Sequence, residues 1–328
     1  MPDASGIAVE SFVSAAAVAA PAFGVDLQHA SLLSLSENVV LRLQTAAGEP
    51  LVMRFHRPGY NSLAEMESEV AYVASLGQTG VPVPNAIATI DGHHYVATPV
   101  EGIDHQVGVV SWVAGEPLGG PLTPGGPELV SHYRRIGEIA GRIRAHATTW
   151  DPPTGFTRRR WDAEGLVGES PLWGRFWEVD GLTSAHRSLF SSAREELLHR
   201  LGELSTGADA FGLIHADLHL GNVMADGDEL TVIDFDDSGF GWFVHELAVS
   251  LHPVVDEPYF DAARDAIVAG YRVEHPLSDE DERLIGTFLA MRGLMIVGWL
   301  DARRDLPHYE HFGHLVAQTE RVVERFLT

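Results

Sequence analysis

The chain contains no cysteine and no lysine. Without cysteine it can form no disulfide bond, no thiolate metal site and no cysteine nucleophile. No run of 18 apolar residues occurs, and no basic segment precedes an apolar one at the N-terminus. Neither a membrane span nor a secretory signal is therefore expected, and we predict a cytoplasmic protein without a membrane partner.

Positive charge is also scarce. The sequence has 46 acidic residues against 22 basic ones, all of them arginine, and a formal net charge of −24. Such a field repels nucleic acid and attracts a cationic substrate. A biased genome or a demand for solubility produces the same composition. The charge thus favours a cationic small-molecule partner without identifying it, and we expect no nucleic-acid partner.

The most informative stretch is residues 211–238, FGLIHADLHLGNVMADGDELTVIDFDDS. An apolar strand leads into the polar loop HADLHLGN, and a short strand, a turn at DGD and a strand ending in DFDD follow. The strand ends therefore bring one histidine, three aspartates and one asparagine into a small volume.

The spacing within this stretch has the pattern that phosphoryl transfer requires. His215-x-Asp217-x-x-x-x-Asn222 is followed twelve residues later by Asp234. In such sites one carboxylate accepts the proton of the attacking hydroxyl, while an amide oxygen and a second carboxylate hold Mg²⁺ on the nucleotide phosphates. The alternative is a surface β-hairpin with scattered acidic residues, and four matches in order argue against it.

The stretch resembles the catalytic and metal-binding segments of the aminoglycoside phosphotransferase and choline kinase superfamily, protein-kinase-like enzymes that mostly phosphorylate small molecules. The resemblance implies that Asp217 is the catalytic base and that Asn222 and Asp234 bind Mg²⁺ on ATP or GTP. It implies that His215 braces the loop through its ring. His219 stands where protein kinases usually carry a lysine.

The resemblance also implies a cation for the α- and β-phosphates, fixed by a glutamate of a downstream helix. The strand LVMRF offers Arg54, and in the expected helix at 62–76 the spacing favours Glu69, with Glu65 as the alternative. Arginine departs from the commoner lysine, because its planar guanidinium grips phosphate through two nitrogens. A surface arginine on an edge strand is the other interpretation of Arg54.

Two backbone segments complete the implied nucleotide site. The turn SLSEN, with Ser36 and Asn38, lies where kinase-like folds cover the phosphates, although it lacks G-x-G-x-x-G. Its N–H groups are candidates for binding phosphate, and a plain hairpin turn is an equal alternative. The backbone of Ser111, Trp112 and Val113 resembles the segment between lobes that pairs with adenine.

The implied fold is α+β and bilobal, as in protein kinases. We expect a small β-rich N-terminal lobe at 1–110, a hinge at 111–127, and a larger helical lobe at 128–328 that holds the catalytic and acceptor-binding residues. Periodicity predicts helices at 9–20, 62–76, 128–148, 183–204, 257–271, 278–300 and 308–326, and N-terminal strands at 29–34, 39–45, 51–55, 86–90, 94–98 and 106–112.

Two further features concern the helical lobe. The irregular stretch 150–180 lies where relatives vary to build the acceptor pocket, so Trp161, Trp173, Trp177 and the RRR run at 158–160 are candidates for lining it. Simple packing of a loop-rich subdomain is an equal alternative. Glu246 replaces the family aspartate that braces the catalytic loop, and we expect it to have a structural role.

The resemblance is nearest to the stress-response kinase and homoserine-kinase-type branch. We expect a Mg²⁺-dependent kinase that transfers the γ-phosphate of ATP or GTP to a hydroxyl of a small molecule, such as an aminoglycoside or an amino alcohol. One alternative is a Ser/Thr protein kinase of the stress-response type. The other is an inactive nucleotide-binding regulator, suggested by Arg54 and the glycine-free turn. Oligomeric state is not predicted.

Overall fold

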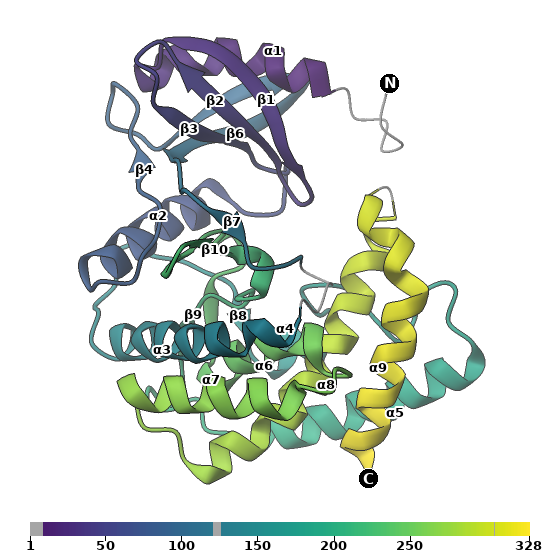
Figure 1. Cartoon of the computed structure of the whole chain (residues 1–328). Coiled ribbons are helices and arrows are strands. Elements are labelled where there is room, and N and C mark those ends of the chain that lie inside the picture. The colour runs from purple at the N-terminus through teal and green to yellow at the C-terminus, as the bar shows by residue number, and fades with distance from the viewer. Residues whose placement is uncertain (1–8, 121–125, 305) are drawn as a thin grey trace. The chain divides into compact units, whose positions relative to one another are not determined.

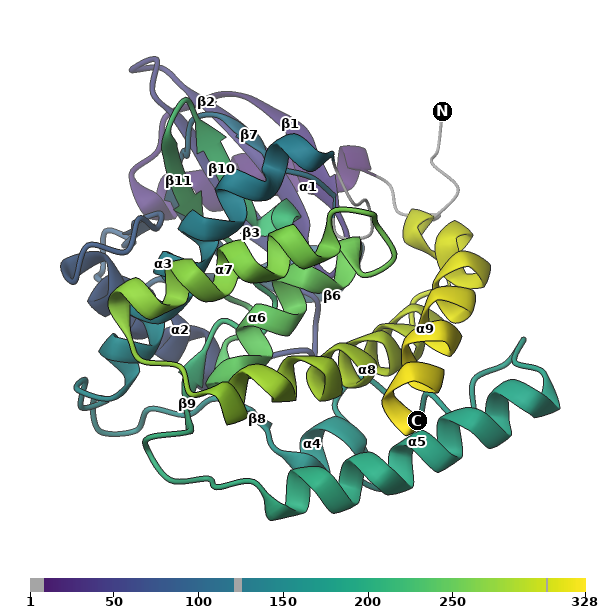
Figure 2. The ribbon, with the colours of Figure 1, turned by 60° about the horizontal axis from the view of Figure 1, so that its bottom comes forward.

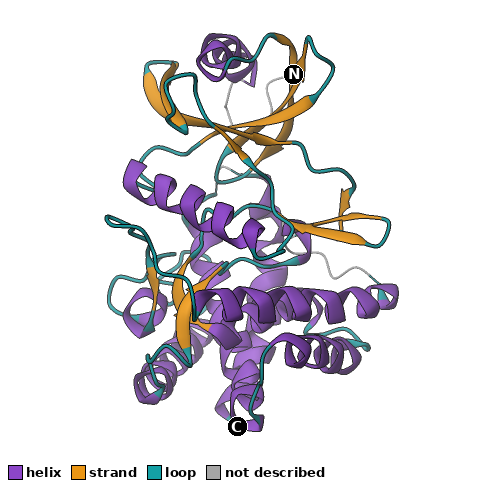
Figure 3. Cartoon of the chain, turned by 90° about the vertical axis from the view of Figure 1, so that its left-hand side faces the viewer, coloured by secondary structure: helices purple, strands orange, loops and turns teal. Residues whose placement is uncertain are grey.

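The computed structural model describes residues 9–120, 126–304 and 306–328. Its chain divides into two compact units. The first holds the described residues up to Ala114 together with Pro152–Thr157, and the second holds Gly115–Asp151 and Arg158–Thr328. The longest strands belong to the first unit and most of the described helices to the second; Figure 3 colours strands and helices separately.

The first unit is built on a six-stranded antiparallel sheet with the order β1-β2-β3-β6-β4, in which β5 pairs with β6. The pattern of β2 explains why it forms a strand: Val39, Leu41 and Leu43 are buried, and they alternate with the more exposed Val40, Arg42 and Gln44. The strands are β1 (Leu27–Leu35), β2 (Val39–Thr45), β3 (Pro50–Phe55), β4 (Ala86–Ile87), β5 (Tyr95–Val100) and β6 (Ile103–Ser111).

Helix α1 (Val9–Ala19) covers one face of this sheet (Figure 1). Its small residues allow close approach, and Phe12 packs edge-on against Phe55 of β3 at 5.3 Å between ring centroids. The other helix, α2 (Leu63–Gln78), begins with a capping box between Ser62 and Glu65. Because Met66, Glu69, Tyr72 and Leu76 follow at helical spacing, α2 buries them on one face.

The second unit contains two three-stranded sheets, β11-β10-β7 and β8-β12-β9. Helix α3 packs along α7, α8 packs against both α6 and α9, and α5 lies against α9 (Figure 2). The elements are β7 (Glu116–Pro117), α3 (Val130–Ala147), β8 (Arg160–Trp161), α4 (Ala163–Val167), α5 (Ser184–Glu203), β9 (Phe211–Ile214), β10 (Val223–Asp226), β11 (Glu229–Val232), β12 (Gly239–Trp242), α6 (Phe243–Leu251), α7 (Phe260–Glu274), α8 (Asp279–Asp301) and α9 (Phe312–Leu327).

Helix α8 runs through the interior of the second unit. By length and composition alone it is apolar enough to cross a membrane, but 78% of its most apolar window is buried inside the structure. Burial on every side accounts for its apolar composition, as in the core helix of a globular protein.

The α+β class and the predicted helices are confirmed, with ends that shift by a few residues. The expected strand at 86–90 is shorter, because Ile90 donates its N–H to the Ala22 carbonyl and leaves the sheet. In the sequence the two compact units meet between Ala114 and Gly115, while the expected division into 1–110, 111–127 and 128–328 stays a prediction. Residues 121–125 of the expected hinge lie outside the described residues. Pro152–Thr157 belongs to the first unit, where Thr157 donates its N–H to Ser68 Oγ of α2 at 3.0 Å.

Glycine sets how closely α3 and α7 approach. A Cβ atom at Gly270 of α7 would lie 1.8 Å from the Arg134 carbonyl oxygen, and one at Gly137 of α3 would lie 2.0 Å from that of Ile267. Any side chain at either position therefore forces the two helices apart.

We predict that Gly270→Ala lowers the free energy of unfolding by about 1–3 kcal/mol, because the added methyl group overpacks this contact. The matched control is Gly286→Ala in α8, where nothing lies within 4 Å of a new Cβ. Alanine there raises the free energy of unfolding by up to about 1 kcal/mol through helix propensity. Urea unfolding of the two variants checks the difference, and equal stabilities would contradict it.

Candidate active site

The loop between β9 and β10 is held in a strained conformation. Ala216 has a φ of +67°, a left-handed value that is unfavourable for a residue with a side chain. Glu246 of α6 accepts the N–H of Ala216 with Oε1 at 3.1 Å, and the same oxygen accepts the N–H of His215. These hydrogen bonds offset the conformational cost of the left-handed backbone at Ala216, and they confirm the structural bracing role expected for Glu246.

His215 ties this loop to the end of β11. Its Nε2–H donates to the Ile233 carbonyl at 3.0 Å, and its Nδ1 accepts the N–H of Asp217 at 3.2 Å. Burial lowers the pKa of His215 to about 4, so the ring is neutral at physiological pH. The ring therefore braces the loop as expected, and a role of His215 in catalysis stays a prediction.

The carboxylate of Asp217 meets donors from its own loop on one oxygen. Its Oδ2 accepts from Asn222 Nδ2 at 3.2 Å and lies 3.3 Å from His219 Nε2. The Gly221 N–H donates to His219 Nδ1 at 3.0 Å, so the ring proton of a neutral His219 sits on Nε2 and points at Asp217. The structure thus brings Asp217, His219 and Asn222 together as the sequence predicts.

The other oxygen, Asp217 Oδ1, accepts from Nη2 of Arg292 in α8. Burial raises the pKa of Asp217, but His219 and then Arg292 lower it by more. The pKa of Asp217 therefore lies well below its ordinary value, and the carboxylate is ionised at physiological pH. An ionised carboxylate in this position accepts a hydrogen bond from a hydroxyl that approaches it.

Sequence reasoning missed Arg292. The signal was present, because Arg292 is the one charged residue among 288–300, inside an apolar helix. A charge in such a place requires a buried partner. The partner lies 75 residues away in the chain, and no periodicity connects the two.

Asn222 and Asp234 suit a hard cation such as Mg²⁺, which prefers carboxylate and amide oxygens. The amide nitrogen of Asn222 faces Asp217, which leaves its oxygen to bind metal. The Ile233 N–H donates to the Asn222 carbonyl at 2.9 Å and holds Asp234 beside it. Asp234 has an exposed side chain and a φ of +65°, a second strained position.

The first unit contains the expected ion pair. Arg54 Nη1 of β3 lies 3.7 Å from Glu69 Oε1 of α2. The other acidic residues of α2 have different partners: Glu65 caps the helix, and Glu67 contacts His94 Nδ1 at 2.8 Å. The structure thus pairs Arg54 with Glu69, the residue that the spacing favours, while contact of either residue with nucleotide stays a prediction.

The expected phosphate-binding turn is closed on itself. The Ser36 N–H donates to the Asn38 carbonyl at 3.2 Å, and Asn38 Oδ1 accepts the N–H of Arg57 at 3.1 Å. These groups stabilise the hairpin, which favours the plain-turn alternative. A phosphate-binding role for Ser36 and Asn38 stays a prediction.

The adenine segment is similarly constrained. The N–H of Ser111 donates to the Asn85 carbonyl at 2.8 Å, and its Oγ accepts the Asn85 N–H at 2.9 Å. The Trp112 ring packs under the Arg42 guanidinium at 4.5 Å. Adenine pairing by 111–113 stays a prediction, and the Ser111 N–H has another role.

The candidates from 150–180 split into two groups. Arg158 donates to the carbonyls of Phe235, Asp236 and Ser238 at 2.6–3.1 Å, and Trp161 Nε1 donates to that of Asp237 at 2.7 Å. These buried side chains therefore fix the segment after Asp234, and for them the packing alternative is right.

Other members of the same stretch take part in contacts of arginine side chains, either with a carboxylate or with an aromatic ring. The Arg159 guanidinium pairs with Asp237 at 3.0 Å. The Arg194 guanidinium lies 4.2 Å from the centroid of Trp177, and that of Arg292 lies 4.9 Å from the centroid of Trp173. Trp173 therefore lies beside the partner of Asp217, where an acceptor wall is expected.

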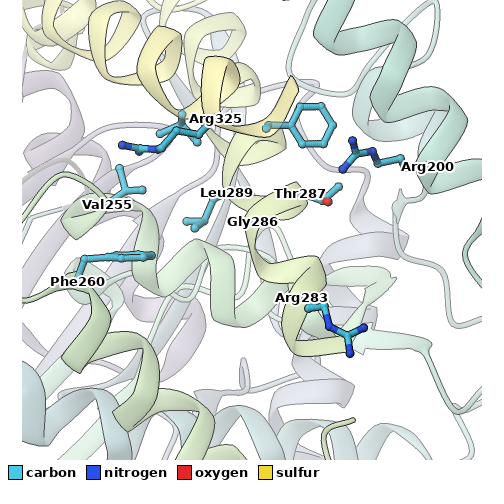
Figure 4. A pocket seen from close by; sticks show the side chains of 10 residues that line it. Arg200, Val255, Phe260, Arg283, Gly286, Thr287, Leu289 and Arg325 are labelled. Atoms are coloured by element: carbon cyan, nitrogen blue, oxygen red, sulfur yellow. The ribbon is translucent and has the colours of Figure 1, made fainter. Parts of the chain in front are cut away.

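A pocket of about 450 Å³ lies beside the N-terminal half of α8, where Gly286, Thr287 and Leu289 line it (Figure 4). Two of its arginines already pair with carboxylates, Arg200 with Glu196 at 2.6 Å and Arg325 with Asp256 at 3.5 Å. The lining includes none of the predicted site residues. It consists of Arg200, Val255, Phe260, Arg283, Gly286, Thr287, Leu289, Val322, Arg325 and Phe326.

We predict that Glu246→Gln changes how stability depends on pH. Burial raises the pKa of Glu246 to about 7, so the folded protein keeps a proton that the unfolded chain releases above pH 4.5. The stabilisation is complete below pH 4.5 and is lost as pH rises through 7. Glutamine does not ionise, so the variant does not lose this stabilisation. Its free energy of unfolding therefore rises relative to that of the wild type by about 1–3 kcal/mol between pH 4.5 and 7.

Urea unfolding of both proteins from pH 4.5 to 8 measures that difference. Groups that titrate equally in both proteins cancel in the subtraction. A difference that stays constant across the range would contradict the assignment.

Comparisons with known proteins agree with this geometry. Residues 30–283 match the model of the phosphotransferase enzyme family. The chain is 26% identical over 302 residues to amicoumacin kinase of Bacillus subtilis (strain 168), which covers 88% of the chain and 85% of that kinase. It is 25% identical over 276 residues to homoserine kinase of Methylobacillus glycogenes, covering 81% of the chain and 77% of the relative.

A solved structure, that of a microcompartment-associated aminopropanol kinase, superposes with a TM-score of 0.82 at 28% identity and covers 95% of this chain and 97% of that one. The kinase-like fold is therefore confirmed. The chain belongs to the phosphotransferase enzyme family and is a small-molecule kinase, which transfers a phosphoryl group to an alcohol.

Proposed function

We propose that this enzyme transfers the γ-phosphoryl group of ATP to a hydroxyl of a small amine-bearing molecule, either an amino alcohol or an antibiotic. The observation that supports the reaction is the ionised Asp217 carboxylate, held by Asn222 and His219 within one loop. Relatives that are kinases of amicoumacin, homoserine and aminopropanol support the acceptor class. The net charge of −24 favours a cationic acceptor.

In the proposed reaction the acceptor hydroxyl donates its hydrogen bond to Asp217. The hydroxyl oxygen forms a bond to the γ-phosphorus, the bond from that phosphorus to the bridging oxygen breaks, and ADP leaves with the electron pair. The hydroxyl proton passes to Asp217 and then to solvent. Positioning and electrostatics lower the barrier, without a covalent enzyme intermediate.

Other residues hold the nucleotide. The Asn222 amide oxygen and the Asp234 carboxylate would hold Mg²⁺, which would neutralise charge on the phosphates. Arg54, oriented by Glu69, would bind the α- and β-phosphates. The cytoplasm, where ATP is abundant, is the compartment that fits this activity.

We predict that Asp217→Asn lowers kcat by at least about 100-fold, because the amide cannot take the hydroxyl proton. Transfer from labelled ATP or GTP with Mg²⁺ is measured to a panel of 1-amino-2-propanol, ethanolamine, choline, homoserine, aminoglycosides and a protein substrate. The control is Asp228→Asn in the exposed turn of the same hairpin, which keeps wild-type activity.

The panel also separates the alternatives. Transfer to one small molecule that is lost in Asp217→Asn identifies the acceptor class. Transfer to the protein substrate alone overturns the proposed acceptor class in favour of a protein kinase. Nucleotide binding without transfer to any member, and without hydrolysis, favours a regulator.

We predict that Glu69→Gln raises the KM for ATP by about 10-fold, because Arg54 loses the carboxylate that orients it. The KM for the acceptor stays near the wild-type value. Glu67→Gln on the same helix is the control, since Glu67 contacts His94. Equal ATP KM values for the two variants would remove Arg54 from the nucleotide site.

A further inference from the structure

The hydrogen bonds of Asp217 leave one clear position for an incoming hydroxyl. Each carboxylate oxygen accepts about two hydrogen bonds. Oδ2 already receives Asn222 Nδ2 and the Nε2–H of His219, at 3.2 and 3.3 Å. Oδ1 receives Arg292 Nη2. One of the two acceptor sites on Oδ1 therefore remains for the acceptor.

Arg292 is held rigidly against this oxygen. The residue is 4% exposed, and its guanidinium lies 4.9 Å from the centroid of the Trp173 ring. The next residue, Gly293, fixes the depth of α8: a Cβ atom there would lie 3.0 Å from Thr319 Oγ1 and 3.2 Å from His252 Nε2. The guanidinium thus has little freedom to leave Asp217.

Stability does not explain this arrangement. Among the residues that the structure describes, Nε and Nη1 of Arg292 are buried without a hydrogen-bond partner. The neighbouring rings of His245 and His252 are neutral and do not compensate the charge of Arg292, because burial and then Arg292 lower the pKa of each to about 3. A buried guanidinium with unpaired N–H groups is costly, and one ion pair with a partly exposed carboxylate offsets little of that cost.

We propose that Arg292 is a positioning residue of the kinase reaction: it fixes the Asp217 carboxylate and reserves the second acceptor site of Oδ1 for the hydroxyl of the acceptor. This assignment rests on the proposed phosphoryl transfer and adds to it. The reacting bonds are those described above, and Arg292 neither gives nor takes a proton.

Arg292 serves the alignment of the Asp217 carboxylate, so its loss lowers kcat more than it changes binding.

A double-mutant cycle between Arg292 and Asp217 tests the proposal. Arg292→Gln lowers kcat by about 100-fold with the KM for ATP unchanged, the loss expected from misalignment of a reacting group. In the Asp217→Asn background the same substitution has no further effect, because its target is already gone. Arg292→Lys recovers part of kcat, since it restores the charge but not the planar geometry. Added methylguanidine recovers part of kcat in Arg292→Ala.

The control for folding is Arg144→Gln, which changes another buried arginine of the same unit, one that contacts the Tyr271 hydroxyl at 3.2 Å. Rates are expressed per folded molecule by urea unfolding of each variant. Arg144→Gln lowers stability and keeps the wild-type kcat. An Arg292→Gln variant that keeps wild-type kcat, or that lowers it equally in both Asp217 backgrounds, overturns the assignment.

Hydrolysis of ATP by water is measured in parallel, because it needs no knowledge of the acceptor. Hydrolysis that falls in Arg292→Gln, but not further in the double variant, supports the role of Arg292. If the wild-type enzyme neither transfers phosphate from ATP to any member of the acceptor panel nor hydrolyses ATP, the proposed function itself is overturned. Turnover that is unaffected by Arg292→Gln overturns the role of Arg292 and leaves the proposed function intact.

Discussion

The rest of the site depends on keeping one partly buried carboxylate, that of Asp217, ionised and in a single orientation. Burial disfavours its charge, so donors from several elements must face it. They come from its own loop through Asn222 and His219, and from α8 through Arg292. The loop in turn needs Glu246 of α6 to hold its strained Ala216. Two helices therefore support this short loop: α6 through the carboxylate of Glu246, and α8 through Arg292, which contacts the carboxylate of Asp217.

Because the chain has no lysine, arginine is its one permanently charged basic side chain. In the second unit buried guanidinium groups act as rigid multiple donors: Arg158 joins three backbone carbonyls, and Arg144 joins a tyrosine hydroxyl to backbone carbonyls. A lysine supplies a point charge and cannot span several acceptors in a plane. In the first unit, Arg54 pairs with Glu69 through Nη1 at 3.7 Å.

Sequence patterns predicted what is local and periodic. The loop that holds Asp217 and Asn222 and the inward face that favours Glu69 follow from spacing along one element. The brace by His215 was implied by the family resemblance. Arg292 escaped prediction because its partner is distant in the chain, although an isolated charge in an apolar helix was visible. Ser36 and Ser111 mark another limit: the sequence places a turn or a strand end, but not the partner that its N–H will take.

The most direct measurement is a crystal structure of the wild-type enzyme with AMP-PNP and Mg²⁺. The account predicts Mg²⁺ bound by the Asn222 amide oxygen and the Asp234 carboxylate, Arg54 on the α- and β-phosphates, and the pair between Arg292 and Asp217 intact. Oδ1 of Asp217 would then be the carboxylate oxygen turned toward the space in front of the γ-phosphate. A metal bound away from Asn222 and Asp234, or Asp217 turned away from the γ-phosphate, would contradict it.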